Sequence, residues 1–276
     1  MGMIAYYDLE KNPPSFDTVT FITWVESERR KRNEPVEVRI LPGPVGGFRR
    51  DSVWPHDVQS RVNMRDNVCA PICGLLPDTT VKVLENREPV AQGSIGYNRM
   101  SIGSVFYADL LRQGLRPLRT ESRPKTDTVT ITLRECDHWP QRNSKVDEWV
   151  KAAKQIPNCI VIRDTRIANE PLEVATCPEA SRSIRTRAEL YRSSYCNFFV
   201  NNGPAWLCVA LDAPMVMLRP ATEGIERGYL YGRAIYRDMG VTDQLPASPC
   251  YQRLVWEDDT ADNILQALDE FKRLNG

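Results

Sequence analysis

The sequence predicts an α/β protein with two Rossmann-like, doubly wound domains. Along residues 128–218, segments of strand character alternate with segments of helix character, and this alternation is typical of parallel sheets. The same order of strand, helix and strand opens the chain between residues 4 and 41. With 276 residues, of which 42% are hydrophobic and 26% charged, the chain can build two cores of ordinary globular composition.

The first predicted domain, residues 1–122, begins with a short strand over 4–9. A Pro-Pro pair then predicts a loop, because proline can continue neither a strand nor a helix interior. Asp17 is the expected N-cap of a helix over 18–33, whose last turn is basic as the helix dipole favours. A second strand over 36–41 precedes a loop rich in glycine and proline.

The pattern is weakest between residues 52 and 122, where it predicts one strand at 80–85 and one helix at 104–114. The polar, proline-containing segment 122–127 is interpreted as the linker between the two domains. The second predicted domain then covers residues 123–258, and no internal repeat or low-complexity segment is visible.

The second domain shows the clearer alternation. Its predicted strands cover 128–134, 158–164, 195–200 and 214–218, and its predicted helices cover 143–156, 188–194 and 205–212. Asn143 or Ser144 is expected to cap the first of these helices, and Thr186 with Glu189 has the spacing of a capping box. An amphipathic C-terminal helix over 259–276 is expected to pack back on the first domain.

Composition limits the possible functions. Lys plus Arg and Asp plus Glu both number 36, so no overall field favours nucleic acid or an anionic membrane. No apolar run is long enough to form a transmembrane segment and no targeting segment is visible, so we expect a cytoplasmic protein. The eight scattered cysteines suit reduced thiols, and with two histidines a metal cluster or a histidine triad is hard to assemble. We therefore expect no metal or other cofactor.

The turn between the strand at 195–200 and the following helix predicts a phosphate site. In parallel sheets, ligands bind at the carboxyl ends of the strands, and Asn201 and Asn202 lie at such an end. Pro204 suits the first helical position, and Gly203 permits close approach of a ligand to the backbone. The free amides near Trp206 would then face a phosphate. The alternative is an ordinary strand-to-helix turn.

The stretch AELYRSSYCNFFVNNGPAWLCVALDAPMVML (188–218) resembles the donor-site segment of GT-B glycosyltransferases, and its pattern is closest to the heptosyltransferase family. The resemblance implies that the backbone of Asn201, Asn202 and Gly203 holds the diphosphate of a nucleotide sugar without a metal. Asn201 stands where the family has an acid, and Trp206 where it has a histidine. For an enzyme of this kind the chain is short, which implies a reduced N-terminal domain.

Two further stretches extend the resemblance. Residues 132–149, TLRECDHWPQRNSKVDEW, resemble the first strand and loop of the family's donor domain, with Asp137 where a lysine is expected. Arg134, Arg142 or Lys145 would supply the missing positive charge, and a guanidinium suits phosphate geometry. The alternative for Arg134 is a salt bridge at the end of a strand.

The third stretch, SFDTVTFITW (15–24), resembles the turn that carries the general base of the family. By this match, Asp17 deprotonates the acceptor hydroxyl, and Asp8 at the end of the first strand is the second candidate. A simple helix cap is the alternative for Asp17. Six other residues are weaker candidates, with surface positions as the alternative: Thr176 and Ser183 for the nucleotide base or the sugar, Thr222 and Glu223 for the ribose or the sugar, and Arg49 and Arg50 for an anionic acceptor.

The resemblance thus implies an inverting, metal-independent glycosyltransferase that moves a sugar from a nucleotide-diphosphate donor to a hydroxyl acceptor. The acceptor would be a glycan or a precursor of a cell-surface polysaccharide. One alternative is a sugar-nucleotide epimerase, which would need a second acid or base facing the sugar. Another is a non-catalytic sugar-nucleotide-binding or interaction module, which the departures at Asn201, Trp206 and Asp137 favour.

Overall fold

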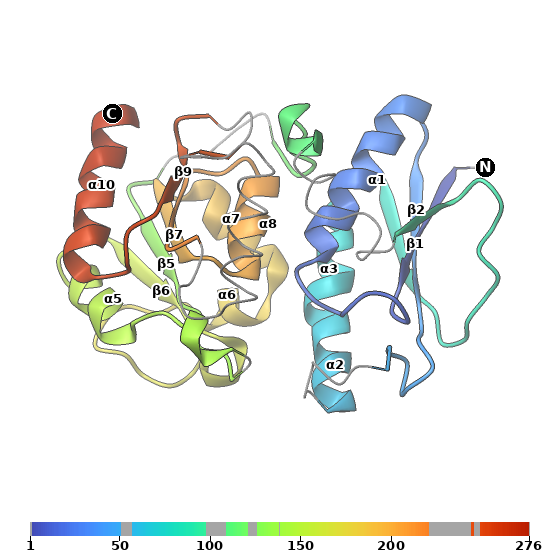
Figure 1. Cartoon of the computed structure of the whole chain (residues 1–276), viewed down its shortest axis with the longest axis horizontal. Coiled ribbons are helices and arrows are strands. Elements are labelled where there is room, and N and C mark those ends of the chain that lie inside the picture. The colour runs from blue at the N-terminus through green and yellow to red at the C-terminus, as the bar shows by residue number, and fades with distance from the viewer. Residues whose placement is uncertain are drawn as a thin grey trace. The chain divides into compact units, whose positions relative to one another are not determined.

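The computed structural model describes residues 2–50, 57–97, 109–120, 126–137, 139–220, 244–245 and 249–275 (Figure 1). The chain divides into two compact units, Met1–Leu118 and Arg119–Gly276. Much of the predicted linker at 122–127 and half of the predicted helix at 104–114 lie outside the described residues, although residues 109–112 are helical.

The first unit contains a parallel four-stranded sheet of order β3-β2-β1-β4. The strands are β1 (Met3–Asp8), β2 (Val36–Leu41), β3 (Thr79–Val83) and β4 (Ile95–Tyr97). The helical elements are α1 (Thr18–Arg32), α2 (Val58–Met64), the π-helical turn η1 (Arg65–Cys69) and α3 (Ala70–Cys73). Helices α1 and α3 lie side by side over one face of the sheet (Figure 1).

Helix α1 forms where its apolar positions predict it, with Val19, Ile22 and Val25 fully buried. It ends at Asn33, which takes the left-handed conformation that asparagine tolerates at a C-cap. Asp17 occupies the N-cap position, but its carboxylate accepts no backbone N–H of the helix. It accepts instead the hydroxyl of Ser15 at 2.9 Å, so the predicted capping bond is absent.

The second unit contains a parallel five-stranded sheet of order β6-β5-β7-β8-β9. The strands are β5 (Val129–Thr132), β6 (Cys159–Ile162), β7 (Cys196–Val200), β8 (Met215–Leu218) and β9 (Gln252–Val255). The helical elements are the 3-10 turns η2 (Pro140–Arg142) and η3 (Thr165–Ile167), and the helices α5 (Val146–Ala153), α6 (Pro178–Arg182), α7 (Ile184–Ser193), α8 (Gly203–Ala210) and α10 (Ala261–Asn275).

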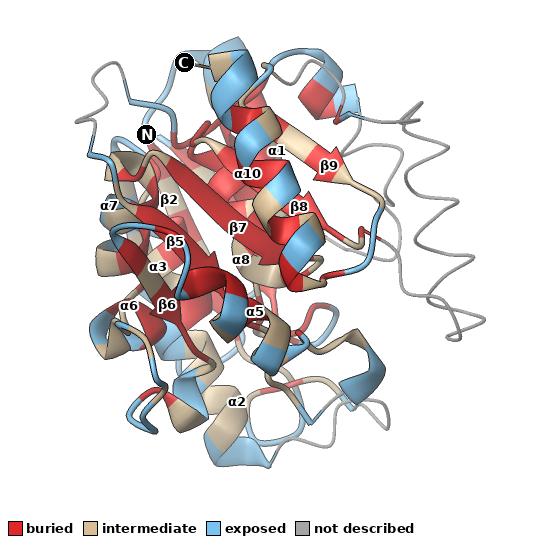
Figure 2. Cartoon of the chain, turned by 90° about the vertical axis from the view of Figure 1, so that its left-hand side faces the viewer, coloured by how far each residue is buried: buried red, intermediate tan, exposed pale blue. Residues whose placement is uncertain are grey.

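The core of this unit lies around the central strands. All residues of β5, β7 and β8 are buried (Figure 2), as expected for parallel strands that are covered on both faces. The indole of Trp149 on α5 packs edge-on against Phe198 of β7, and Phe271 on α10 packs against Tyr195. Helix α10 lies beside α5 and also contacts β8.

The two parallel sheets confirm the predicted α/β class. Sequence patterns missed β4, β9 and the helical segment from α2 to α3. The predicted capping box is also wrong, because α7 begins one turn before Thr186. The residue that caps α7 is Ser183, whose hydroxyl accepts the Thr186 N–H at 3.2 Å.

Candidate functional site

The carboxyl ends of β5 and β7 form the switch point of the second sheet. From β5 the chain passes to β6 on one side, and it then returns to β7 on the other side of β5. Connections that leave in opposite directions open a crevice where ligands of such sheets bind. The loop after β5 and the turn after β7 both start at this edge.

The turn after β7 is held by its two asparagines. The side-chain amide of Asn201 donates to the carbonyl of Pro220 at 2.5 Å, which joins this turn to the residues after β8. Asn202 is extended, and its Oδ1 accepts the N–H of Ala205 at 3.0 Å. Asn202 is thus the N-cap of α8, Gly203 and Pro204 form its first turn, and that turn contains no acid.

The amide nitrogen of Asn202 has no hydrogen-bond partner among the described residues. The side chain cannot be flipped to correct this, because the Ala205 N–H requires the oxygen where it stands. Asn202 is only 7% exposed. An unpaired buried donor is unfavourable and indicates that an acceptor is absent.

The loop after β5 is organised around Arg134 and Asn143. The guanidinium of Arg134 donates to the carbonyl of Trp139 at 3.0 Å and to Oδ1 of Asn143. The Asn143 amide donates to the carbonyl of Cys136 at 3.0 Å, and the hydroxyl of Ser144 accepts the Arg134 N–H at 2.9 Å. Asn143 and Ser144 therefore close this loop and do not cap α5 as predicted, since Lys145 occupies the N-cap position.

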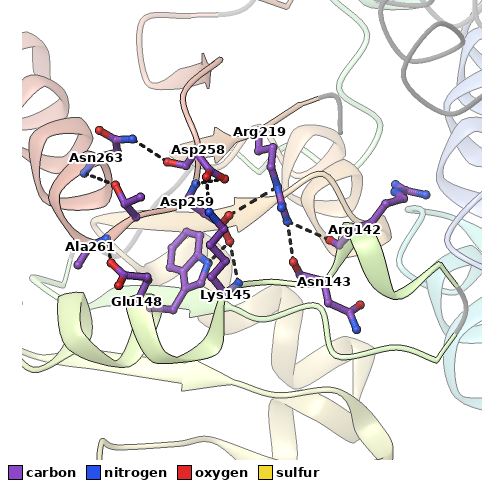
Figure 3. Close-up of polar contacts among 11 residues, drawn as sticks. Arg142, Asn143, Lys145, Glu148, Arg219, Asp258, Asp259, Ala261 and Asn263 are labelled. Atoms are coloured by element: carbon purple, nitrogen blue, oxygen red, sulfur yellow. Dashed lines mark hydrogen bonds and ion pairs between the residues drawn. The ribbon is translucent and has the colours of Figure 1, made fainter. Parts of the chain in front are cut away.

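Two further arginines connect this loop to neighbouring strands. Arg142 Nη2 donates to the carbonyl of Asn201 at 3.0 Å, which joins η2 to the turn after β7. Arg219, the residue after β8, donates through Nη2 to the carbonyls of Arg142 and Asn143 at 3.3 and 2.6 Å (Figure 3). Three arginines therefore bind the loop and turn at the carboxyl ends of β5, β7 and β8, Arg134 and Arg219 within the loop after β5 and Arg142 between that loop and the turn after β7.

The electrostatics of Arg134 reflect this crowding. Burial, and then the positive charges of Arg142 and Arg219, lower the pKa of Arg134 to about 10. A guanidinium seldom loses affinity for its proton to this extent, because its charge is usually solvated or paired. A bound anion would offset the repulsion from Arg142 and Arg219.

The N-termini of α5 and α10 at the same edge each face a carboxylate (Figure 3). Asp259, which is fully buried, accepts the N–H of Lys145 at 2.9 Å and the indole N–H of Trp149 at 2.8 Å. In return, Glu148 on α5 accepts the Ala261 N–H of α10 at 2.7 Å. The positive ends of these two helices are therefore compensated, whereas the cap of α8 is a neutral amide.

The remaining candidates of the second unit lie elsewhere or cannot be placed. Thr176 forms an isolated bridge with Val161 of β6. The Ser183 hydroxyl is occupied by the cap of α7 and also accepts the hydroxyl of Thr186 at 3.0 Å. Thr222 and Glu223 lie outside the described residues.

In the first unit, both candidate bases lie at or after the carboxyl end of β1. Asp8 is 4% exposed and accepts two bonds from the Arg87 guanidinium, at 2.8 and 2.6 Å, and one from the Glu10 N–H at 3.0 Å. Asp17 is half-buried and accepts the Ser15 hydroxyl. Asp8 is therefore held in an ion pair with Arg87.

The two predicted acceptor arginines lie in the loop after β2. Arg49 is half-buried and donates to the carbonyl of Lys11 at 3.3 Å, which places it against the loop that carries Asp17. Arg50 is exposed.

The structure thus brings Arg134, Arg142 and the Asn201–Pro204 turn together. Sequence reasoning missed Arg219 and Asp259. A usable signal existed for Arg219, because a charged residue directly follows the buried strand at 214–218. No comparable pattern marked Asp259.

Solved structures with a similar arrangement were found at low identity. The E. coli heptosyltransferase WaaC with ADP aligns with a TM-score of 0.43 and 11% identity over 98% of this chain and 100% of that one. WaaC with ADP-2-deoxy-2-fluoro heptose gives 0.39 and 10% over 97% and 99%. The iron-containing dodecameric glycosyltransferase TibC from enterotoxigenic E. coli H10407 gives 0.39 and 13% over 78% and 57%.

Comparison with protein families and with curated proteins found no match. Within the described ranges, no helix is both long and apolar enough to span a bilayer, and no cluster of three or more potential metal ligands is present. Structural similarity with TM-scores below 0.5 and identities of 10–13% assigns neither an activity nor site residues to this chain.

Proposed function

We propose that this chain is a glycosyltransferase whose second unit binds the diphosphate of a nucleotide-sugar donor. The observation that carries the proposal is the contact of Arg142 with the turn before the neutrally capped N-terminus of α8, together with the positive charges of Arg134 and Arg219 around the loop that carries Arg142. Guanidinium groups and helix N-termini are the two protein elements that suit phosphate oxygens best. One buried carboxylate, Asp259, lies 3.6 Å from Arg219, and its other oxygen is already bound at the N-terminus of α5.

A diphosphate accounts for the local chemistry better than a single carboxylate would. Its two phosphate groups can accept from the α8 amides and from the arginines at the same time, because the turn after β7 is joined to η2 through Arg142. The unpaired amide nitrogen of Asn202 supplies one more donor. We infer that the donor binds here without a metal, with Asn201, Gly203 and Pro204 shaping the turn.

The proposed reaction is a single displacement with inversion. The bond between the anomeric carbon and the diphosphate oxygen breaks as the acceptor hydroxyl oxygen bonds to that carbon, and the acceptor proton passes to a carboxylate. The leaving nucleoside diphosphate gains negative charge, which the arginines and the α8 N-terminus stabilise. We assign the base to Asp17 in preference to Asp8, because the Asp8 carboxylate is bound by Arg87.

For the acceptor we propose a glycan or a polysaccharide precursor, in a cytoplasmic enzyme. If that acceptor is anionic, Arg49 is the better placed of the two acceptor arginines, because it contacts the loop that carries Asp17. Thr176, Ser183, Thr222 and Glu223 stay predictions for the base, the ribose or the sugar.

Binding and turnover test the proposal separately. Titration calorimetry with inorganic pyrophosphate, ADP, UDP and GDP should show binding, and Arg134→Met should weaken it by about tenfold or more. Arg166→Met is the matched control, because Arg166 is exposed and pairs with Asp137 in the same unit. Binding of none of these anions would refute the proposal.

Slow hydrolysis of the matching nucleotide sugar should be detectable, and Asp17→Asn should abolish it without changing donor affinity. Donor hydrolysis that survives this substitution would refute the assignment of the base. Binding without any turnover of donor would instead favour a non-catalytic nucleotide-sugar module, and interconversion of the sugar without acceptor would favour an epimerase.

A further inference from the structure

Arg219 adopts a backbone conformation that arginine does not favour. Its φ is +47°, in the left-handed region where a side chain with a Cβ is strained and glycine is not. The backbone is held there by β9 and its following residues, because the Arg219 N–H is shared between the carbonyls of Val255 at 2.9 Å and Glu257 at 3.2 Å. An arginine at such a position indicates that its side chain has a role that offsets the strain.

The side chain of Arg219 is 14% exposed and lies between two loops. Its Nη2 donates to the carbonyls of Arg142 and Asn143, which are more than seventy positions earlier in the chain. On its other side, Nε lies 3.6 Å from Oδ1 of Asp259, and neither atom has a hydrogen-bond partner in the described part of the chain. Asp259 itself is fixed by α5 through its second oxygen.

The two carbonyls belong to the residues whose side chains organise the candidate site. Arg142 reaches the turn after β7 from this backbone, and Asn143 accepts from Arg134. A shift of η2 would therefore move both guanidiniums relative to the N-terminus of α8. Donors on Arg219 oppose such a shift, because each carbonyl would lose its bond.

The geometry points to Arg219 as a positioning residue that fixes η2, and through it Arg142 and Arg134, for anion binding. This inference rests on the proposed function, because it presupposes that the site binds a diphosphate. A positioning role differs from a direct contact between Arg219 and the bound anion, because in a direct contact Arg219 would act independently of Arg142.

A double-mutant cycle with inorganic pyrophosphate separates the two roles. Arg219→Gly removes the side chain and also suits the left-handed backbone, so relief of strain should offset part of the stability lost with two hydrogen bonds and the ion pair to Asp259. We expect pyrophosphate to bind roughly tenfold more weakly to Arg219→Gly and to Arg142→Ala. Because Arg219 also acts through Arg134, the double variant should lose more than about tenfold in affinity but clearly less than the roughly hundredfold loss of additive effects. Arg219→Lys keeps donors for both carbonyls and should restore affinity to within about threefold.

The control for relief of backbone strain is Asn158→Gly, since Asn158 also has a positive φ, of +51°, and lies at the opposite end of β6. It should leave the affinity unchanged. Additive losses in the cycle would overturn the positioning role and leave the proposed function standing. A wild-type protein that does not bind pyrophosphate would overturn both, and if Arg219→Gly does not fold, the same cycle with Arg219→Met decides.

Discussion

Replacing Asn202 by aspartate tests the anion site without disturbing the fold. The carboxylate keeps the oxygen that caps α8 and interacts favourably with the helix dipole, but it replaces the unpaired amide donor by a negative charge. Loss of one donor to a charged ligand removes about 1.5 kcal/mol of binding energy. Repulsion from a phosphate about 4 Å away adds about 2–4 kcal/mol at the effective dielectric constant of a protein surface. Affinity for pyrophosphate should therefore fall by more than about a hundredfold.

Calorimetry with pyrophosphate at a pH where the new carboxylate is ionised measures this change, and urea denaturation measures stability in parallel. Asn202→Ser is the matched control, because it keeps a capping oxygen and loses only the amide donor, so the loss should be about tenfold. Both variants should unfold within about 1 kcal/mol of the wild type. If the affinity of Asn202→Asp for pyrophosphate is within about threefold of the wild-type affinity, the proposal that an anion binds at the N-terminus of α8 is refuted.

Two predictions concern the first unit. Arg87→Met should lower the free energy of unfolding by about 2 kcal/mol, because the buried Asp8 keeps only the Glu10 N–H and a longer contact to Lys11. Arg30→Met is the control and should change it by less than about 0.5 kcal/mol, since Glu26 keeps its pair with Arg29. Equal losses for the two variants in urea denaturation would contradict this prediction. The ion pairs with Lys82 and Arg39 lower the pKa of Glu37, and the pair with Arg39 lowers that of Glu88, both from 4.5. The stability that these carboxylates contribute is present above pH 4.5 and should be lost as the pH falls below 4.5 through their lowered pKa values, and Arg39→Met should flatten the measured dependence of unfolding on pH.

The architecture of the second unit could be predicted because its local signals agree with its tertiary structure. Strands β5, β7 and β8 are short, fully buried segments rich in apolar and β-branched residues, and β7 is followed directly by helix α8, which Asn202 caps and which has a proline in its first turn. The segment from α2 to α3 gave no such signal, since no residue of α2 is buried and the chain passes through a π-helical turn before α3. Strand β9 was missed because it has polar residues at two of its four positions.

The caps were predicted less well than the helices they begin. Asn143 and Ser144 have the right residue types for capping α5, but both serve the loop that contains Arg134. The cap of α5 comes instead from Asp259, more than a hundred residues later. Local sequence shows which residues can cap a helix, whereas tertiary contacts decide which residue does.

Tertiary contacts at the helix N-termini also indicate where on the second sheet a ligand would bind. Helices α5 and α10 exchange carboxylates, Asp259 and Glu148, so their positive ends are already balanced within the protein. Helix α8 starts at a neutral asparagine with an unpaired amide, and Arg142 contacts the residue before it. A chain that supplies carboxylates to two helix ends and none to the first turn of the third leaves a positive charge that an external anion can balance. The contrast between α8 and the other two helices depends on the contact of Asp259 with α5. It could therefore not be predicted from the sequence of the turn at 201–204 alone.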